Sequence, residues 1–398
     1  MKSNQTYTVM EKYILTINGG SSSIKFALYV ADGSFARTMI GKIDRIGLPG
    51  SFLVYSKGES KEVVRETPLV DYRAAVEMLN SFLGEEVDFN NIVVVGHRIV
   101  HGMGRDRHAV VTSELIAELK DTSPIDPEHL PLEIAILETF AERHATLVQV
   151  ACFDTVFHHD MPRVAQLLPI PRRFDAKGVR RYGFHGLSCS YLIEELRRVD
   201  PSKAEGRVII AHLGNGASVT AVKEGKSVDT SMGFTPTGGI PMSSRTGDLD
   251  PGTLWYIMKS EGLSLESLSH LINHESGLLG ISETSSNMYD LLEAQANDVR
   301  AKEAVDLFCY EVKKHIGAYA AAMGGVDTVI FTGGMGENAP RIRTRICAGL
   351  EFLGITIDGA HNEGNKEIIS SSSAPICVRV MRTNEELMIA RIASELGK

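Results

Sequence analysis

The sequence predicts a two-domain protein of the α/β class. Its 398 residues exceed the length of about 250–300 residues at which a single hydrophobic core usually stops growing. Short apolar runs alternate with amphipathic segments, the pattern of a parallel or mixed sheet covered by helices. Two strand–turn–strand stretches of similar composition begin about 195 residues apart, which leaves open either a duplicated domain or a chance similarity.

The predicted strands form two groups, one before residue 155 and one after residue 205. In order they are 12–18, 25–31, 91–96 and 147–153, then 207–213, 217–222, 327–333 and 376–381. Apolar residues at helical spacing predict helices over 185–199 and 305–323. A last helix is expected after Thr383, which we predict to be its N-cap because Glu386 follows at the spacing of a capping box.

Composition and charge exclude several classes of partner. The net charge of −9 argues against broad binding of nucleic acid or of an anionic membrane. The five cysteines have no CxxC spacing, which is typical of reduced thiols in a cytosolic protein. The first twelve residues contain no apolar segment of a signal peptide, and no apolar run reaches the roughly 18 residues of a membrane helix. We therefore expect a cytoplasmic protein.

Three glycine-rich turns predict a site for phosphate groups. The turn at 18–25 contains Asn18, two glycines, three serines and Lys25, and successive backbone N–H groups in such a turn form a donor array for anions. A long flexible hairpin is the structural alternative. The second turn is 212–218, and the third is 331–343, where a strand runs into glycines and then into a helix with Pro340 in its first turn.

Two standard nucleotide-binding motifs, the P-loop and the dinucleotide fingerprint, match the sequence only poorly. The stretch "TAVKEGKS" has Thr220 where a P-loop needs its first glycine. The stretch "GMGENA", 334–339, matches the dinucleotide fingerprint G-x-G-x-x-A after a strand, but this short match is weak and does not open its domain. NAD binding is therefore a minor alternative.

Basic residues beside glycine predict a local anion site in this acidic chain. Arg98, His185 and Arg245 each lie in or next to a glycine-containing loop, and Asp154 and Glu385 are the acidic candidates. Alternatives remain at two positions, an ion pair at a domain interface for Arg98 and helix capping for His185. Oxygen ligands together with phosphates indicate Mg²⁺ rather than zinc, because no HExxH motif or spaced Cys/His set occurs.

Ten motifs give the chain a resemblance to the acetokinase (acetate kinase) family. In order they are "INGGSSSIKF", "GHRIVHG", "CFDTVFH", "RRYGFHG", "HLGNGAS", "SVDTSMGFTP", "RTGDLDPG", "SGLLGIS", "FTGGMGEN" and "TNEEL", and they span about 13–396. The resemblance implies two duplicated actin-like (ribonuclease H-like) domains with a central cleft that closes on ATP, in a homodimer. The first domain would cover 1–155 and be completed by a helix at about 384–398, and the second would cover 156–383.

The resemblance also implies a reaction and roles for residues. The reaction is reversible phosphoryl transfer from ATP to acetate, which gives acetyl phosphate and ADP. Asp154 matches the family's catalytic acid, while His185 and Arg245 would stabilise the transferred phosphoryl group. Arg98 would bind the carboxylate, with Val100, Phe184 and Pro236 around the methyl group. Asn18 and Glu385 would place Mg²⁺, for which Mn²⁺ can substitute. ATP would be contacted by Lys25, His212, Leu213, Gly214, Asn215, Gly216, Asn287, Met288, Tyr289, Gly334, Met335, Gly336, Glu337 and Asn338.

The chain departs from the family pattern at three places. Ile125 and Asp126 replace a leucine and a histidine near the substrate pocket, Asn287 and Tyr289 replace nucleotide contacts, and "GFHGLSC" lacks its second histidine. A carboxylate at position 126 would repel the substrates, so we expect it to pair with a cation such as Arg98 or Arg105. Acyl chain length (acetate, propionate or butyrate), the phosphoryl donor (ATP, another nucleotide or pyrophosphate) and the physiological direction stay open.

Chemistry restricts the role of Asp154 and the competing classes. Acetate, with a pKa of roughly 4 to 5 like other carboxylic acids, is already ionised at pH 7, so transfer needs positioning and charge neutralisation rather than a general base. We therefore expect Asp154 to orient an arginine or a metal-bound water. A chaperone or filament ATPase would leave the arginine–histidine set unexplained, and a sugar kinase would need an aspartate base and a polar pocket.

Overall fold

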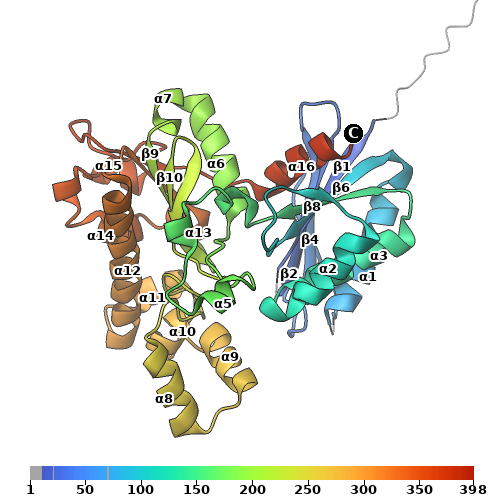
Figure 1. Cartoon of the computed structure of the whole chain (residues 1–398). Helices are drawn as coiled ribbons and strands as arrows, with labels where there is room; N and C mark the ends of the chain where they lie inside the picture. Colours follow the sequence, from blue (N-terminus) through green and yellow to red (C-terminus); the bar gives the residue numbers. More distant parts are fainter. Residues whose placement is uncertain (1–10, 21, 70) are drawn as a thin grey trace, which may run out of the picture. The chain divides into compact units, whose positions relative to one another are not determined.

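The computed structural model describes residues 11–20, 22–69 and 71–398 (Figure 1). Ser21 of the first predicted phosphate turn and most of the polar N-terminal segment lie outside these residues. The chain divides into two compact units. The first contains the residues up to Val156 and Asn384–Lys398, and the second is Phe157–Thr383. Within the described residues, no helix has the length and apolar character needed to cross a membrane.

The first unit is built on a mixed sheet. Its described strands are β1 (Tyr13–Gly19), β2 (Ser23–Val30), β3 (Arg37–Asp44), β4 (Phe52–Lys57), β5 (Val63–Glu66), β6 (Ile92–Ile99), β7 (Ala109–Val110) and β8 (Val148–Phe153). They lie in the order β5-β4-β3-β2-β1-β6-β8-β7. Strands β1 to β5 pair antiparallel, β1, β6 and β8 are parallel, and β7 is antiparallel to β8.

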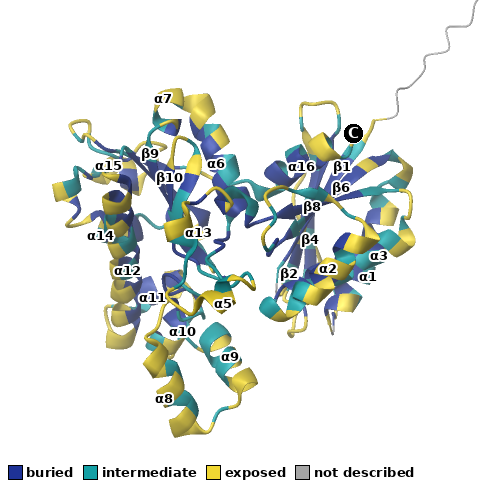
Figure 2. Ribbon diagram, in the orientation of Figure 1, coloured by how far each residue is buried: buried dark blue, intermediate teal, exposed yellow. Residues whose placement is uncertain are grey.

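Helices cover both faces of this sheet. They are α1 (Tyr72–Glu86), α2 (Ser113–Thr122), α3 (Leu130–Arg143) and α16 (Glu385–Leu396), with the 3₁₀ turns η1 (Phe89–Asn91) and η2 (Ser123–Ile125). Val95 packs with α1 and α3, and Gly96 faces α16, because successive residues of a strand point to opposite faces. A side chain at Gly96 would meet Ile389 at 2.5 Å, so glycine is what lets α16 approach β6. The central strands β1, β2, β6 and β8 are buried over most of their length (Figure 2), whereas the strand β5 is exposed.

The second unit has a smaller sheet. Its described strands are β9 (Arg207–Leu213), β10 (Ala217–Lys223), β11 (Lys226–Thr230), β12 (Thr328–Thr332) and β13 (Cys377–Val380), in the order β11-β10-β9-β12-β13. The hairpin strands β9, β10 and β11 are antiparallel, and β9, β12 and β13 are parallel. Helix α6 (Gly186–Val199) packs on one face through Leu192 and Leu196, while α12 (Val299–Met323) contacts β9 and β10.

The remaining helices surround this sheet or extend from it. They are α4 (Arg163–Gln166), α5 (Arg172–Asp175), α6 (Gly186–Val199), α7 (Pro201–Ala204), α8 (Pro251–Glu261), α9 (Leu265–His274), α10 (Gly277–Ser282), α11 (Met288–Ala294), α12 (Val299–Met323), α13 (Gly333–Asn338), α14 (Pro340–Cys347) and α15 (Gly359–Glu363). The 3₁₀ turns are η3 (Val156–His158) and η4 (Glu351–Leu353). Helix α12 begins before the predicted residue 305 because Asp298 caps it and accepts hydrogen bonds from two backbone N–H groups.

The two sheets repeat one topology. The order β3-β2-β1-β6-β8 of the first unit has the same strand directions and the same sequence order as β11-β10-β9-β12-β13 of the second. The glycine-rich turns of the sequence echo therefore occupy equivalent places, after β1 in one unit and after β9 in the other. This agreement decides the open question in favour of duplication.

The start of α16 corrects one prediction. The N-cap is Asn384, whose side chain accepts a hydrogen bond of 3.1 Å from the backbone N–H of Leu387. Thr383 was predicted for this place, but its hydroxyl instead lies 2.9 Å from that of Ser188. Asparagine is among the strongest N-cap residues, and the helix begins one residue later than expected. The capping box with Glu386 is therefore absent.

Candidate functional site

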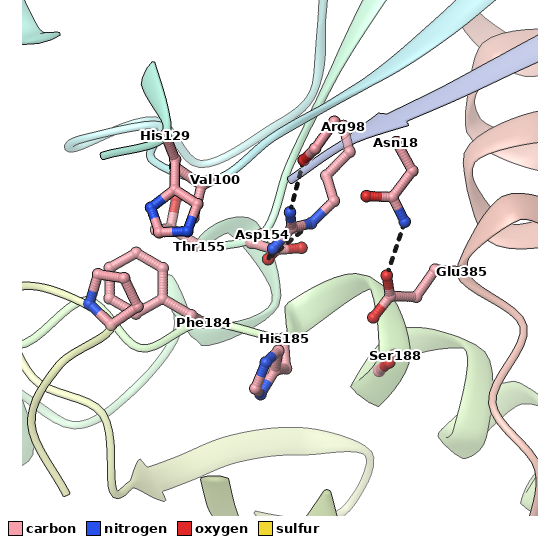
Figure 3. Close-up of polar contacts among 12 residues, drawn as sticks. Asn18, Arg98, Val100, His129, Asp154, Thr155, Phe184, His185, Ser188 and Glu385 are labelled. Carbon is pink, nitrogen blue, oxygen red and sulfur yellow. Dashed lines mark hydrogen bonds and ion pairs between the residues drawn. The ribbon is translucent and has the colours of Figure 1, made fainter. Parts of the chain in front are cut away.

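The first unit holds Arg98 next to Asp154 (Figure 3). One oxygen of the fully buried Asp154 accepts hydrogen bonds from Nε and Nη2 of Arg98, at 3.1 and 2.6 Å. Nη1 donates to the carbonyl oxygen of Gly19 at 3.3 Å. Burial lowers the pKa of the guanidinium, but the carboxylates of Asp154, Glu385 and Glu133 outweigh it and raise that pKa. Arg98 is therefore a permanent, oriented cation, paired inside its own unit.

A pair of carboxylates at the start of α16 faces the β1–β2 hairpin. The side-chain amide of Asn18 donates to Glu385 at 3.0 Å and to Glu386 at 3.4 Å (Figure 3). Lys25 is the direct cross-strand neighbour of Asn18 and is exposed. Carboxylate and amide oxygens are the ligands that Mg²⁺ prefers, and Mg²⁺ usually binds one or two carboxylates together with water and phosphates. The donor set at Asn18 and Glu385 therefore fits the predicted ion.

Val100 follows directly after β6 and is 2% exposed. Its backbone N–H donates at 2.8 Å to the carboxyl group of Glu133 on α3. It follows Arg98 by two residues, so the end of β6 carries both a cation and an apolar residue, the two kinds of group that a small carboxylic acid requires.

Asp126 pairs, but not with the predicted arginines. Its carboxylate lies 2.9 Å from Nδ1 of His129 and accepts a hydrogen bond from the backbone N–H of the same residue. Arg105 instead pairs with Glu118, and Arg98 pairs with Asp154. The prediction failed because Asp126 ends η2, one helical turn before His129, so the local partner is nearer than either arginine.

In the second unit His185 has an unusual backbone. It precedes α6 with a left-handed φ of 58°, and no side-chain hydrogen bond from it caps the helix. Its Nδ1 instead lies 2.9 Å from the hydroxyl of Ser218, and its ring stacks on that of His212 with 4.2 Å between the centroids. The capping alternative is therefore wrong. A positive φ is uncommon for a non-glycine residue, and histidine is among the residues that adopt it more often.

Arg245 lies close to His185 within this unit. A side-chain carbon placed at Gly216 would be 3.3 Å from Nε2 of His185 and 4.0 Å from Nη1 of Arg245. Nη1 of Arg245 also donates to the carbonyl oxygen of Pro236 at 3.3 Å. The backbone carbonyl oxygen of Asn215 accepts a hydrogen bond of 3.2 Å from the backbone N–H of Ser243. This bond joins the glycine-rich turn to the loop that carries Arg245. Two cationic or proton-donating groups thus face one glycine of the turn.

The two glycine-rich turns of the second unit lie side by side. Strands β9 and β12 are parallel neighbours, so the turns after Leu213 and Thr332 emerge at the same edge of the sheet. A side-chain carbon at Gly214 would be 4.0 Å from the backbone nitrogen of Gly334, and one at Gly333 would be 2.8 Å from the carbonyl oxygen of Leu213. The structure brings these predicted nucleotide residues together.

The second turn contains more helix than predicted. Its glycines form the short helix α13, and Pro340 then begins α14 as expected. The Glu337 carboxylate accepts hydrogen bonds from the backbone N–H groups of Gly333 at 3.0 Å and Thr383 at 3.3 Å. Met335 and Gly336 are buried, while Asn338 is exposed and its amide donates to the carbonyl oxygen of Gly334. Glu337 thus fixes the turn.

Asn287, Met288 and Tyr289 begin α11, which packs on α12. Asn287 is the N-cap and accepts a hydrogen bond of 2.9 Å from the backbone N–H of Tyr289. Met288 is buried, and Tyr289 is 71% exposed. Of the three, Tyr289 presents the most side-chain surface to a ligand.

Sequence reasoning missed two buried residues that support the site. His158 lies 2.9 Å from the carbonyl oxygen of Phe184 through Nε2 and 2.9 Å from Ser227 through Nδ1, and it anchors the segment before His185. Burial lowers the pKa of His158 to about 4, so it is neutral at pH 7. Glu133 contacts Val100 as described above. The one available signal for Glu133 was a charge inside the apolar stretch "LPLEIAI".

The repeated topology, with polar turns after the first strand of each unit, defines a duplicated actin-like fold. Residues 13–391 match the acetokinase family over nearly the whole chain. The chain belongs to that family.

Individual relatives agree with this result. An acetate kinase of Thermotoga maritima is 42% identical over 397 residues, which cover 96% of this chain and 98% of that protein. The crystal structure of Porphyromonas gingivalis acetate kinase has a TM-score of 0.87 at 38% identity, and it covers 97% of this chain and 100% of its own. A propionate kinase of Francisella tularensis has a TM-score of 0.90 at 35% identity with the same coverage.

Family membership confirms the predicted α/β class with duplicated actin-like domains and the predicted class of enzyme. The chain is a kinase that transfers a phosphoryl group to a carboxylate. Binding of a nucleoside triphosphate follows from the same membership.

Proposed function

We propose that the protein is an acetate kinase that transfers the γ-phosphoryl group of ATP directly to acetate. A carboxylate oxygen of acetate attacks phosphorus, the bond to the bridging oxygen of ADP breaks, and acetyl phosphate and ADP leave. The observation that carries the proposal is Arg98, a partly buried guanidinium that Asp154 holds near the end of β6, two residues before the buried, apolar Val100. A planar, fixed cation suits a carboxylate, and an apolar neighbour suits a methyl group.

Asp154 is proposed as a positioning group rather than a general base. The carboxylate of Asp154 accepts two hydrogen bonds from the side chain of Arg98, and acetate brings no proton to remove at pH 7. Asp154→Asn should lower kcat strongly and leave the shape of the pH–rate profile unchanged. Loss of an acidic limb in the variant would instead assign a proton-transfer role to Asp154.

The phosphate groups are proposed to bind the turns of the second unit, with His185 and Arg245 stabilising charge on the transferred group. Glu385 and Asn18 would hold Mg²⁺, which neutralises charge on the β- and γ-phosphates when bound. Catalysis in this proposal depends on positioning and charge neutralisation, so no side chain has to act as a general acid or base. From the family resemblance we also propose a cytoplasmic homodimer, whose mass light scattering would measure.

A matrix of donors and acceptors tests the proposal. Purified protein is given ATP, GTP or pyrophosphate with acetate, propionate, butyrate or glycerol, and acyl phosphate is trapped with hydroxylamine. The highest kcat/KM is expected for ATP with acetate and Mg²⁺. A higher value for propionate would instead make the protein a propionate kinase, the activity for which the Francisella tularensis relative is named. Failure to form any acyl phosphate would overturn the proposal.

A further inference from the structure

A second carboxyl group lies beside the Arg98–Asp154 pair. Glu133 of α3 is 2% exposed, and its Oε1 lies 3.9 Å from Nη1 of Arg98. Its Oε2 accepts the backbone N–H of Val100 at 2.8 Å. Glu133 therefore lies next to both residues that we propose to bind the substrate. It faces the guanidinium of Arg98 and accepts a hydrogen bond from the backbone of Val100. Among the described residues, Oε1 has no hydrogen-bond partner.

The charge balance around Arg98 makes the ionisation state of Glu133 important. One guanidinium already neutralises the buried Asp154, and a second ionised carboxylate would leave a net negative charge where an anionic substrate is expected to bind. Burial raises the pKa of Glu133 to about 8, although Arg98 and the N–H of Val100 act in the opposite direction. The neutral acid therefore predominates at pH 7.

We propose that Glu133 is a positioning residue for the substrate carboxylate: its neutral form fixes Arg98 and Val100, and its deprotonation weakens substrate binding. The proposal rests on the proposed assignment of Arg98 to that carboxylate. Deprotonation would place a negative charge within 4 Å of the guanidinium, where it competes with the substrate for one cation.

The groups that face Glu133 come from each element around it. Arg98 comes from β6, Asp154 follows β8, and Asp126 precedes α3. Tyr72 comes from α1, and burial followed by the charge of Glu133 raises the pKa of its phenol. Lys120 of α2 pairs with Glu138 on α3. Arg98 stays charged and Tyr72 stays neutral between pH 6.5 and 9.5, so neither residue would produce a change in KM near pH 8.

The expected result is a split between KM and kcat. KM for acetate should be flat below about pH 7 and rise above pH 8, toward tenfold per pH unit if only the neutral form binds. The value of kcat at saturating acetate should change less, because bound enzyme already has the competent charge state. Glu133→Gln keeps an oxygen that accepts from Val100 but has no proton to lose, so its KM should stay flat to pH 9.5.

Steady-state kinetics from pH 6.5 to 9.5 on the wild type, Glu133→Gln and Glu142→Gln test this inference. Glu142 is an exposed residue of the same helix, so its variant should follow the wild type. Parallel profiles for wild type and Glu133→Gln would overturn the inference while acetate turnover left the proposed function standing. Absence of acyl phosphate from the wild type would instead overturn the proposed function.

A spectroscopic titration decides the point even if Glu133→Gln fails to fold. The wild-type protein labelled with ¹³C at the glutamate δ carbon is titrated from pH 5 to 10. One glutamate resonance with an apparent pKa near 8, unchanged in the Glu142→Gln control, is the expected result. Titration of every glutamate below pH 7 would overturn the inference.

Discussion

The two units share a strand order but hold their polar groups in different ways. In the first unit, Arg98 and Asp154 form a buried pair of opposite charges. In the second, His185 is held by a serine hydroxyl and a stacked ring, and His158 by a carbonyl oxygen. On the proposed function, one fold supports two chemistries, a fixed charge for a small carboxylate and an array of donors for phosphates.

The largest expected effect tests the second unit. Arg245→Ala should lower kcat about 10³-fold, because an arginine that stabilises the transferred phosphoryl group contributes about that much. Arg245→Lys should recover little, since a point charge lacks the planar fork. Steady-state kinetics with Arg341→Ala as the control, an exposed arginine paired with Glu293, provide the measurement. Full activity of Arg245→Lys would contradict a geometric role.

The next effect tests the first unit. Arg98→Lys should raise KM for acetate about tenfold to 100-fold and change kcat less, because lysine cannot bind Asp154 and a substrate carboxylate in one plane. Arg105→Lys, in a partly exposed pair with Glu118, is the matched control and should remain within about twofold of the wild type. Equal losses in the two variants would remove the special role of Arg98.

A smaller effect concerns the apolar neighbour of Arg98. Val100→Ala should shift the ratio of kcat/KM values from acetate toward propionate by about tenfold, since one methylene is worth about 1–3 kcal/mol in a pocket. The two substrates are compared in parallel hydroxamate assays. An unchanged ratio would show that Val100 does not contact the methyl group.

The buried acid and the buried histidine should respond to pH with opposite signs. The folded-state pKa of Glu133, about 8, lies above its ordinary value of 4.5, so its contribution to stability is present below pH 4.5 and lost as pH rises to 8. The pKa of His158, about 4, lies below its ordinary 6.5, so its contribution is present above pH 6.5 and lost as pH falls to 4.

Urea unfolding of Glu133→Gln and His158→Gln at several pH values measures this contrast. Relative to wild type, the first variant should gain stability as pH rises and the second as pH falls, by up to about 1.4 kcal/mol per pH unit. Differences with the same sign in both variants would contradict the assigned charge states.

The smallest effect concerns the cap of α16. Asn384→Ala should lower the free energy of unfolding by about 1 kcal/mol, because the N–H of Leu387 loses its acceptor. Asn384→Ser should lose less than alanine does. A neutral Asn384→Ala together with a destabilising Thr383→Ala would restore Thr383 as the cap.

Local pattern predicted eight of the described strands, but not β3, β4, β5, β7 or β11. Sequence reasoning also reached the family and its duplicated fold, because these depend on motif order. It missed residues whose role depends on a partner distant in sequence. Glu133 contacts Val100 across 33 residues, and His158 contacts Ser227 across 69. The error at Asp126 was of the opposite kind, since a long-range partner was predicted where the partner is three residues away. The pattern of residue types does not show which of several possible partners a polar side chain will bind in the folded protein.

The central claim is that Arg98 of the first unit binds the carboxylate and that the glycine-rich turns of the second unit bind the phosphate groups of the nucleotide. The most direct test measures the dissociation constants of acetate and of Mg–ADP for Asp154→Asn and Gly334→Ala. A methyl group at Gly334 has no protein atom within 4 Å, so its effect reports on the ligand alone. We predict that Asp154→Asn weakens acetate binding at least about tenfold with Mg–ADP within twofold, and that Gly334→Ala does the reverse. Equal weakening of both ligands by either variant would contradict the account.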